Sequence, residues 1–423
     1  MQPTVKFDRT LVTVLVDEVV HVMLELAAPP ATPMQRAPLD VVVVLDRSGS
    51  MGGAPLAAVT QATAQLLRLA GDNDRVGVVA FDSDVQLVLP LGRHDADRDG
   101  HAVLQLQPGG TTNLSGGWLK GLEMLTSDVR PDALRRIILL TDGQANAGIT
   151  GVGNLAPLVK SGHAQGVTTS FIGFSDDYDE VLLAALADAG MGNDYWCAGP
   201  DQAAQVFADE FGGLASVVAQ NVSVEIAPSD AVAATAVLNE FPVTQVAHGV
   251  QVALGDAYGG EHRRVVAKFH LRPITADGPI DVATLTIRWA GTAGDVALHT
   301  VTVPVVVTAG AANGGEVDPG ASPEVTEEVL RLEVAKARRD AREAAERGDY
   351  DAASGFLRLG ASHATHLPMS EALVHELSID ADRLTAGQWD AGDAKRHMAR
   401  SRGTSKGRRT EYSADTDEHG NPI

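Results

Sequence analysis

The sequence predicts an α/β domain that is inserted in a β-sandwich and followed by a helical region. Three observations carry this prediction. Continuous apolar strands alternate with helical segments between residues 39 and 200, which is typical of a doubly wound, mostly parallel sheet covered on both faces. Short strands separated by turn-forming residues occupy 217–308, the pattern of a β-sandwich. Helical spacing of Leu and Ala begins again at residue 324.

Residues 1–36 carry the first strand patterns. The stretches "TLVTVLV" and "VHVMLEL" alternate apolar and polar side chains in places, and "APPATPMQRAP" closes them. These strands have no other sheet to join, so we expect them to complete the sandwich formed by 217–308. The α/β domain at 39–200 would then lie, in the chain, between strands of that sandwich.

The α/β domain begins with a run of valines and continues with strands and helices in turn. Its first strand, 41–45, is followed by a helix with spaced Leu, Val and Ala. Further strands are predicted at 75–81, 85–90, 135–141 and 168–174, and helices at 54–70, 116–127, 155–166 and 179–190.

The last quarter of the chain changes character twice. Residues 309–323 are rich in Gly, Ala and Pro and are predicted to be a linker. Residues 324–400 are predicted to be helical. Residues 401–423 are basic and then polar, without an apolar period, and are therefore predicted to be a disordered tail.

Composition excludes several classes of function. The net charge of −22 disfavours nucleic-acid binding and attachment to anionic membranes, both of which need a basic surface. The single cysteine, Cys197, excludes an internal disulfide and a multi-cysteine zinc site. No run approaches the ~18 apolar residues of a membrane helix, and the N-terminus does not have the pattern of a signal peptide. We therefore expect a soluble, cytoplasmic protein without a membrane or nucleic-acid partner.

Polar side chains follow two of the predicted strands. In "LDVVVVLDRSGSMGG" the valine strand runs directly into Asp46, Ser48 and Ser50, and Asp142 ends the later strand in "RRIILLTDG". Between them, "GGTTN" places Thr111 and Thr112 in a glycine-rich loop before a helix. Because loops after parallel strands converge at the carboxyl edge of the sheet, we expect these groups to lie close together.

Every candidate ligand in this set is an oxygen. Two carboxylates with several hydroxyls suit a hard divalent cation such as Mg²⁺, whereas zinc and copper favour imidazole and thiolate. Arg47 lies between the ligands in sequence and is expected either to screen the site or to form a salt bridge at its rim. The alternative interpretation of all these residues is a set of strand-end turns with N-capping serines.

Residues 39–198 resemble the von Willebrand factor type A domain family. "DRSGSM" is similar to its Asp-x-Ser-x-Ser motif, "GGTTN" to its threonine loop and "LLTDG" to its distal aspartate. The resemblance implies a metal-ion-dependent adhesion site that holds Mg²⁺, with Mn²⁺ or Ca²⁺ possible. The wider layout is also similar to bacterial relatives of the inter-alpha-trypsin inhibitor heavy chains.

The resemblance assigns roles residue by residue. Ser48, Ser50 and a loop threonine would coordinate the metal directly, and Asp46 and Asp142 directly or through water. The threonine that matches the family pattern is Thr112, with Thr111 as the alternative. One coordination position would stay open for an Asp or Glu of a protein partner.

Three functions compete at this stage. The first is a non-enzymatic adaptor or complex subunit that binds a partner's acidic residue through the metal, with an ATPase-linked complex as the partner by resemblance. The second is a scaffold that acts through its C-terminal helices, with the metal site regulating it. The third, a Mg²⁺-dependent hydrolase, is disfavoured because Ser48 and Ser50 would be occupied as ligands.

Overall fold

The computed structural model describes residues 1–31, 36–174, 178–197, 199–292, 297–310, 318–406 and 408–409. The chain divides into two compact units. One contains Ala31–Val218 with Thr292–Val296, and the other contains Met1–Pro30, Ala219–Gly291 and Ala297–Ile423. The fold class predicted from the sequence is confirmed: an α/β unit interrupts the strands of a β-sandwich, and helices follow the sandwich.

The first unit contains a six-stranded sheet with the strand order β6-β5-β4-β7-β8-β9. The strands are β4 (Leu39–Asp46), β5 (Arg75–Phe81), β6 (Val85–Gly92), β7 (Leu134–Thr141), β8 (Val167–Phe174) and β9 (Met191–Cys197). All pairs are parallel except β5 with β6, so the sheet is mostly parallel as predicted. All eight residues of β4 are buried, which explains its continuous apolar sequence.

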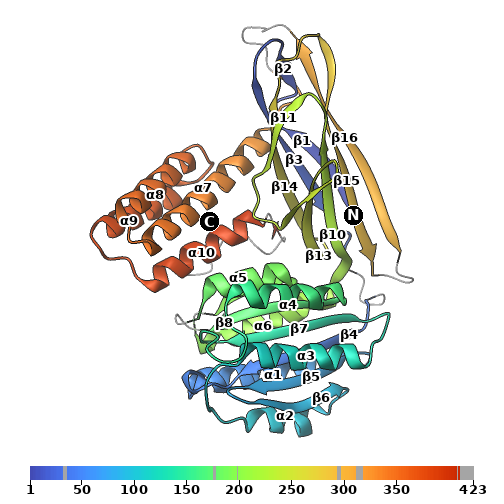
Figure 1. Ribbon diagram of the computed structural model, residues 1–423, viewed down its shortest axis with the longest axis vertical. Coiled ribbons are helices and arrows are strands. Elements are labelled where there is room, and N and C mark those ends of the chain that lie inside the picture. Colours follow the sequence, from blue (N-terminus) through green and yellow to red (C-terminus); the bar gives the residue numbers. More distant parts are fainter. Residues whose placement is uncertain are drawn as a thin grey trace. The chain divides into compact units, whose positions relative to one another are not determined.

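Helices pack on this sheet in two groups (Figure 1). They are α1 (Ala54–Leu69), α2 (Ala96–Leu104), α3 (Leu114–Ser127), α4 (Val152–Ala164), α5 (Glu180–Ala189) and α6 (Pro200–Ala215). Helices α3, α4 and α5 share a core with Val42 and Val44 of β4. Helix α1 packs with α2 and α6. Because α6 belongs to this unit, the unit reaches residue 218 rather than the predicted boundary at 200.

The sandwich in the second unit consists of two sheets. One has the order β1-β3-β14-β11, with β17 (Arg408–Arg409) pairing to β14, and the other has the order β12-β13-β10-β15-β16-β2. The strands are β1 (Gln2–Phe7), β2 (Leu11–Thr13), β3 (Glu18–Ala27), β10 (Val217–Pro228), β11 (Val232–Val237), β12 (Val243–Val246), β13 (Gly249–Tyr258), β14 (His262–Leu271), β15 (Gly278–Gly291) and β16 (Leu298–Gly310).

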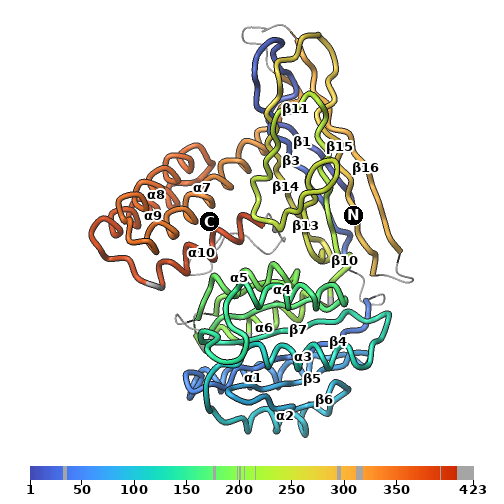
Figure 2. Tube along the Cα trace, viewed as in Figure 1, coloured from blue at the N-terminus to red at the C-terminus, as the bar shows by residue number. Residues whose placement is uncertain are grey.

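The N-terminal strands belong to both sheets of this sandwich. Strand β3 pairs antiparallel with β14 from Glu18 to Ala27, and β2 pairs parallel with β16. Figure 2 shows the blue N-terminal trace beside the yellow and orange strands that follow the α/β unit in sequence. A small apolar void between the sheets is lined from both of them, by Val22, Leu24, Val265 and Ala267 on one side and Val224, Ile226 and Leu285 on the other.

Four helices end the second unit: α7 (Pro323–Glu346), α8 (Tyr350–Ala364), α9 (Glu371–Thr385) and α10 (Ala391–Ser405). The prediction that disorder begins at residue 401 is wrong for 401–405, which form the last turn of α10. Reciprocal capping by Asp390 and Asp393 starts this helix, and Ser401 and Ser405 are buried in tertiary contacts. Most of the predicted tail, 410–423, lies outside the described residues. Among the helices that the structure describes, none is long and apolar enough to span a membrane.

Candidate metal centre

Backbone hydrogen bonds hold the loop after β4 against the loop before α3. The N–H of Gly109 donates to the carbonyl of Arg47 at 2.8 Å, and the N–H of Gly49 donates to the carbonyl of Gly110 at 3.2 Å. Ser48 and Gly109 form a parallel bridge. Since these contacts are made by the main chain, the position of the loop that carries Ser48 and Ser50 does not depend on side-chain contacts.

The loop after β7 is tied to the same place. The N–H groups of Asn146 and Ala147 both donate to the carbonyl of Thr112 at 3.2 Å, and the Asn146 side chain accepts from the N–H of Thr112 at 2.8 Å. Asn113 caps α3 by accepting from the N–H of Gly116 at 3.0 Å. Thr112 is thereby held between the helix start and the loop that follows Asp142.

The five predicted ligands come together at the carboxyl edge of β4 and β7. The hydroxyls of Ser48 and Ser50 lie 3.2 Å apart, and Ser50 Oγ donates to Asp142 Oδ1 at 2.8 Å. Asp46 Oδ1 accepts from the N–H of Ser48 at 2.8 Å. A Cβ at Gly143 would lie 3.4 Å from Thr112 Oγ1 and 3.8 Å from Ser50 Oγ, so Thr112 belongs to the same cluster.

The two threonines of the loop before α3 occupy different environments. Thr112 is buried and faces this cluster. Thr111 is exposed, and its Oγ1 lies 3.0 Å from Ser83 Oγ in the turn after β5. The structure therefore places Thr112, and not Thr111, beside Ser50 and Asp142.

Asp46 is fully buried, and its electrostatic environment is unusual for a carboxylate. In the described part of the chain, Oδ2 accepts from Thr141 Oγ1 at 2.6 Å and Oδ1 accepts from the Ser48 N–H, and no cationic side chain contacts either oxygen. Burial raises the pKa of Asp46 to about 6, because these hydrogen bonds only partly offset the lost hydration and the negative charge of Asp142 raises it further.

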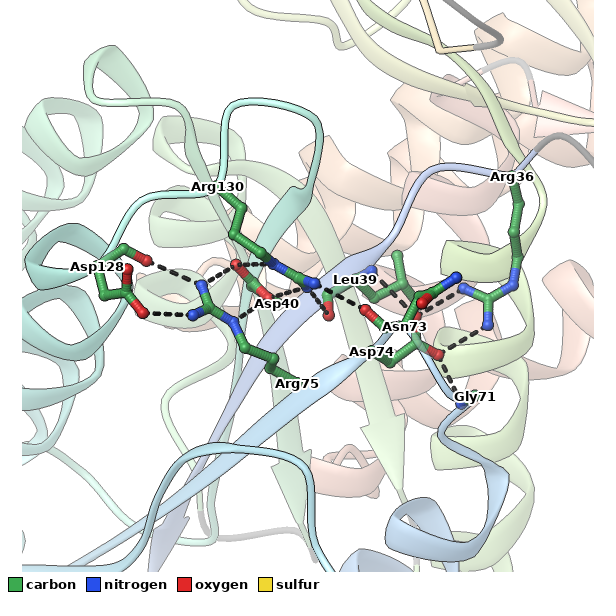
Figure 3. Close-up of polar contacts among 9 residues, drawn as sticks. All are labelled: Arg36, Leu39, Asp40, Gly71, Asn73, Asp74, Arg75, Asp128 and Arg130. Atoms are coloured by element: carbon green, nitrogen blue, oxygen red, sulfur yellow. Dashed lines mark hydrogen bonds and ion pairs between the residues drawn. The ribbon is translucent and has the colours of Figure 1, made fainter.

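Two other buried carboxylates of this unit, those of Asp40 and Asp74, have arginine partners. Figure 3 shows the opposite, amino end of β4 and β5, where Arg75 contacts Asp40 with two nitrogens at 2.9 and 2.6 Å and Arg130 contacts the same carboxylate. Arg36 contacts Asp74 with two nitrogens, each at 2.8 Å. Burial alone would raise the pKa of both aspartates, but the arginines hold both pKa values below the ordinary range.

Two further groups, one at the rim and one buried, complete the centre. Arg47 forms a salt bridge with Asp82, with Nη2 3.2 Å from Oδ2, which agrees with the rim salt bridge expected for it. Thr141, which holds Asp46, was not singled out from the sequence. Its position directly before Asp142 at the end of a predicted strand is the signal that could have found it.

The donor set fits a hard divalent cation. It consists of two carboxylates and three hydroxyls from three loops, without a nitrogen or sulfur ligand among them. A cation would also supply the positive charge that Asp46 lacks in its described surroundings. A bound metal would be held by Asp46, Ser48, Ser50, Thr112 and Asp142, and would provide an electrophilic centre for an anionic ligand.

Comparison with known proteins places residues 40–207 in the family described as the von Willebrand factor type A domain. The chain is 25% identical over 386 residues to the Synechocystis protein sll0103, covering 86% of this chain and 87% of that protein. It is 30% identical over 253 residues to the Arabidopsis thaliana E3 ubiquitin-protein ligase WAV3, covering 58% of this chain but only 32% of WAV3.

The similarity to the inter-alpha-trypsin inhibitor heavy chains is shorter. Heavy chain H3 of Bos taurus is 30% identical over 130 residues, which is 29% of this chain and 14% of that protein. A solved structure titled "von Willebrand factor type A from Catenulispora acidiphila" superposes with a TM-score of 0.73 at 17% identity, covering 94% of this chain and 96% of that one. Residues 40–207 of the chain therefore form a von Willebrand factor type A domain.

Proposed function

We propose that this protein is a metal-dependent interaction module, an adaptor or complex subunit that binds an Asp or Glu of a protein partner through a divalent cation. The cation is Mg²⁺, held by Asp46, Ser48, Ser50, Thr112 and Asp142. Because three of these five ligands are neutral hydroxyls, the cation keeps enough positive charge to attract an incoming carboxylate.

The observation that carries the proposal is the contrast between Asp46 and two other buried carboxylates of the unit, Asp40 and Asp74. Asp40 and Asp74 each face an arginine, whereas Asp46 faces a hydroxyl, a backbone N–H and the charge of Asp142. An uncompensated buried charge costs several kcal/mol and is rare unless it pairs or binds a metal. A cation at this position supplies the missing compensation.

The residues of these loops support a hydrolytic function less well than a binding function. Residues 46–53, 108–113 and 141–151 include no His, Cys or Lys that could act as a general base or nucleophile. In the proposed site the hydroxyls of Ser48 and Ser50 are metal ligands, so they would not serve as nucleophiles. We therefore propose a binding role rather than an enzymatic one, with an ATPase-linked complex as one class of partner.

Paramagnetic Mn²⁺ offers a direct test of both parts of the proposal. Free Mn²⁺ measured by electron paramagnetic resonance should fall when wild-type protein is added and should not fall with Asp46→Ala. Asp97→Ala is the matched control, since that carboxylate is 89% exposed on α2. A short peptide with one Glu should then lower the water-proton relaxation of bound Mn²⁺ more than its Gln analogue does.

Affinity capture addresses the partner. Wild-type protein in Mg²⁺ should retain a partner that is lost in EDTA and with Asp46→Ala, but kept with Asp97→Ala. Capture that survives EDTA unchanged would show that binding does not use the metal. Equal relaxation changes with the Glu and Gln peptides would show that the metal does not accept a carboxylate.

A further inference from the structure

The C-terminal helix α10 buries polar rather than apolar side chains. Its buried side chains, as far as the structure describes them, are all polar: Asp393, Lys395, His397, Ser401 and Ser405. The apolar core of the helical region is formed by α7, α8 and α9, and Trp389, just before α10, only borders it. Burial of apolar surface therefore contributes little to the attachment of α10.

Side chains of α10 reach across to α9 at three places. His397 Nε2 lies 2.9 Å from Asp380 Oδ2, Arg383 lies 2.7 Å from Asp393 Oδ1, and Arg400 pairs with Glu376. Burial lowers the pKa of His397 despite its bond to Asp380, so at neutral pH this contact is a hydrogen bond of the neutral ring.

Helix α10 also packs on α7, which contributes a buried arginine to the same cluster. Arg338 Nη2 lies 3.1 Å from Glu376 Oε1. Within the described residues, Arg338 Nη1 and His397 Nδ1 are buried without a hydrogen-bond partner. Each such atom costs about 1–3 kcal/mol, so these two atoms reduce the net stabilisation that the ion pairs of this interface provide.

Three ligand-type groups of this cluster, on Glu376, Asp380 and His397, lie within 4.8 Å of one another. A metal ion would nevertheless meet Arg338 and Arg400, which already pair with Glu376. The guanidinium groups of the two arginines already supply the positive charge that a metal ion would supply. The cluster is therefore better explained as a seat for basic side chains than as a metal site.

We propose that the face formed by α7 and α9 is a docking site for a helix that carries His and Arg one turn apart. In this structure α10 fills the site. A partner helix of the same chemistry binds there by displacing α10. His397 and Arg400 of α10 show the spacing, and Asp380 and Glu376 are the acceptors. The net charge of −22 favours a basic partner helix over an acidic one. This site uses none of the five residues of the metal centre.

A labelled peptide with the sequence of residues 388–406 is the probe, added to the full-length chain. Arg400→Glu weakens the chain's own α10 and leaves α7 and α9 unchanged. We expect this variant to bind the peptide about tenfold more tightly than wild type, because the competing internal helix has lost an ion pair. Adding Glu376→Ala to Arg400→Glu should abolish the gain, and Arg358→Glu, which changes an exposed pair with Asp382, should bind as wild type does.

Equal binding by wild type and Arg400→Glu, or binding that persists with Glu376→Ala, would overturn the proposal. Hydrogen exchange on the wild-type chain provides a second measurement that needs no variant. Amides of α10 should exchange faster than those of α7, and raising NaCl to about 0.5 M should widen the difference because salt screens the ion pairs. The same protection in both helices at both salt concentrations would show that α10 does not detach.

Discussion

Replacing Asp46 by Asn should have opposite effects on stability without and with a divalent cation. The amide keeps the size of the carboxylate and can still accept from the Ser48 N–H, while Thr141 Oγ1, now a donor to Asp46 Oδ2, can accept from the amide. The substitution therefore removes a buried charge and leaves the hydrogen bonds in place.

The magnitude follows from the raised pKa. Asp46 has a pKa of about 6 in the cation-free native protein against 3.8 ordinarily. Each pH unit corresponds to about 1.4 kcal/mol, so the ionised form costs about 3 kcal/mol at pH 7.5. The native state binds the proton more tightly than the unfolded state does, so this cost grows between pH 4 and pH 6 and then stays constant. In EDTA, Asp46→Asn should be more stable than wild type by up to about 3 kcal/mol above pH 6 and equal to it near pH 4.

Magnesium should invert the order. Mg²⁺ at a thousand times its dissociation constant adds about 4.1 kcal/mol to a protein that binds it only when folded, which exceeds the cost of about 3 kcal/mol, and the Asn variant should gain almost nothing. The assay is urea unfolding at pH 4 to 8, in EDTA and in Mg²⁺, with Asp97→Asn as the control that behaves as wild type. A variant that is destabilised in EDTA at pH 7.5, or that gains as much from Mg²⁺ as wild type, would refute the reasoning.

Three further predictions concern other residues of the α/β unit. Ser50→Ala should lower the unfolding free energy in EDTA by about 1 kcal/mol, because it removes the hydrogen bond to the buried Asp142 carboxylate, and should also lower Mg²⁺ affinity in calorimetric titration. Arg75→Met should cost about 3 kcal/mol at pH 7 by leaving Asp40 undercompensated. Because the arginines lower the pKa of Asp40, that loss in urea unfolding should shrink as the pH falls below 4. Gly117→Val should cost about 1–3 kcal/mol in thermal unfolding, since a Cβ there would lie 2.6 Å from the Phe81 ring; Gly153→Ala, with open space around it, should not.

Periodicity and strand order allowed most of the fold to be predicted. The valine strand β4 and the helices after it are recognisable because their apolar spacing is set by burial on two faces. The N-terminal strands could be assigned to the sandwich because unpaired strands need a partner sheet, and β3 does pair with β14. The predicted helical region ended at residue 400, five residues before the end of α10. The buried positions of α10 are polar, so its sequence lacks the apolar period that marks a buried helix.

The ligand set could be anticipated, but its electrostatics could not. The motifs at the ends of two predicted strands indicated that Asp46, Ser48, Ser50 and Asp142 lie at one edge of the sheet. Only the structure shows which of the two threonines, Thr112 or Thr111, lies beside them. The arginine pairs of Asp40 and Asp74 join residues that are up to 90 positions apart in the chain. No local pattern records such pairs, so the contrast that distinguishes Asp46 emerges only from the structure.

Anomalous diffraction from crystals grown with Mn²⁺ tests the central claim most directly. The account predicts a strong peak within bonding distance of the hydroxyls of Ser48, Ser50 and Thr112, beside Asp46 and Asp142, and no such peak in Asp46→Ala crystals. A wild-type map without a peak among these five residues, at a Mn²⁺ concentration that saturates binding in solution, would contradict it.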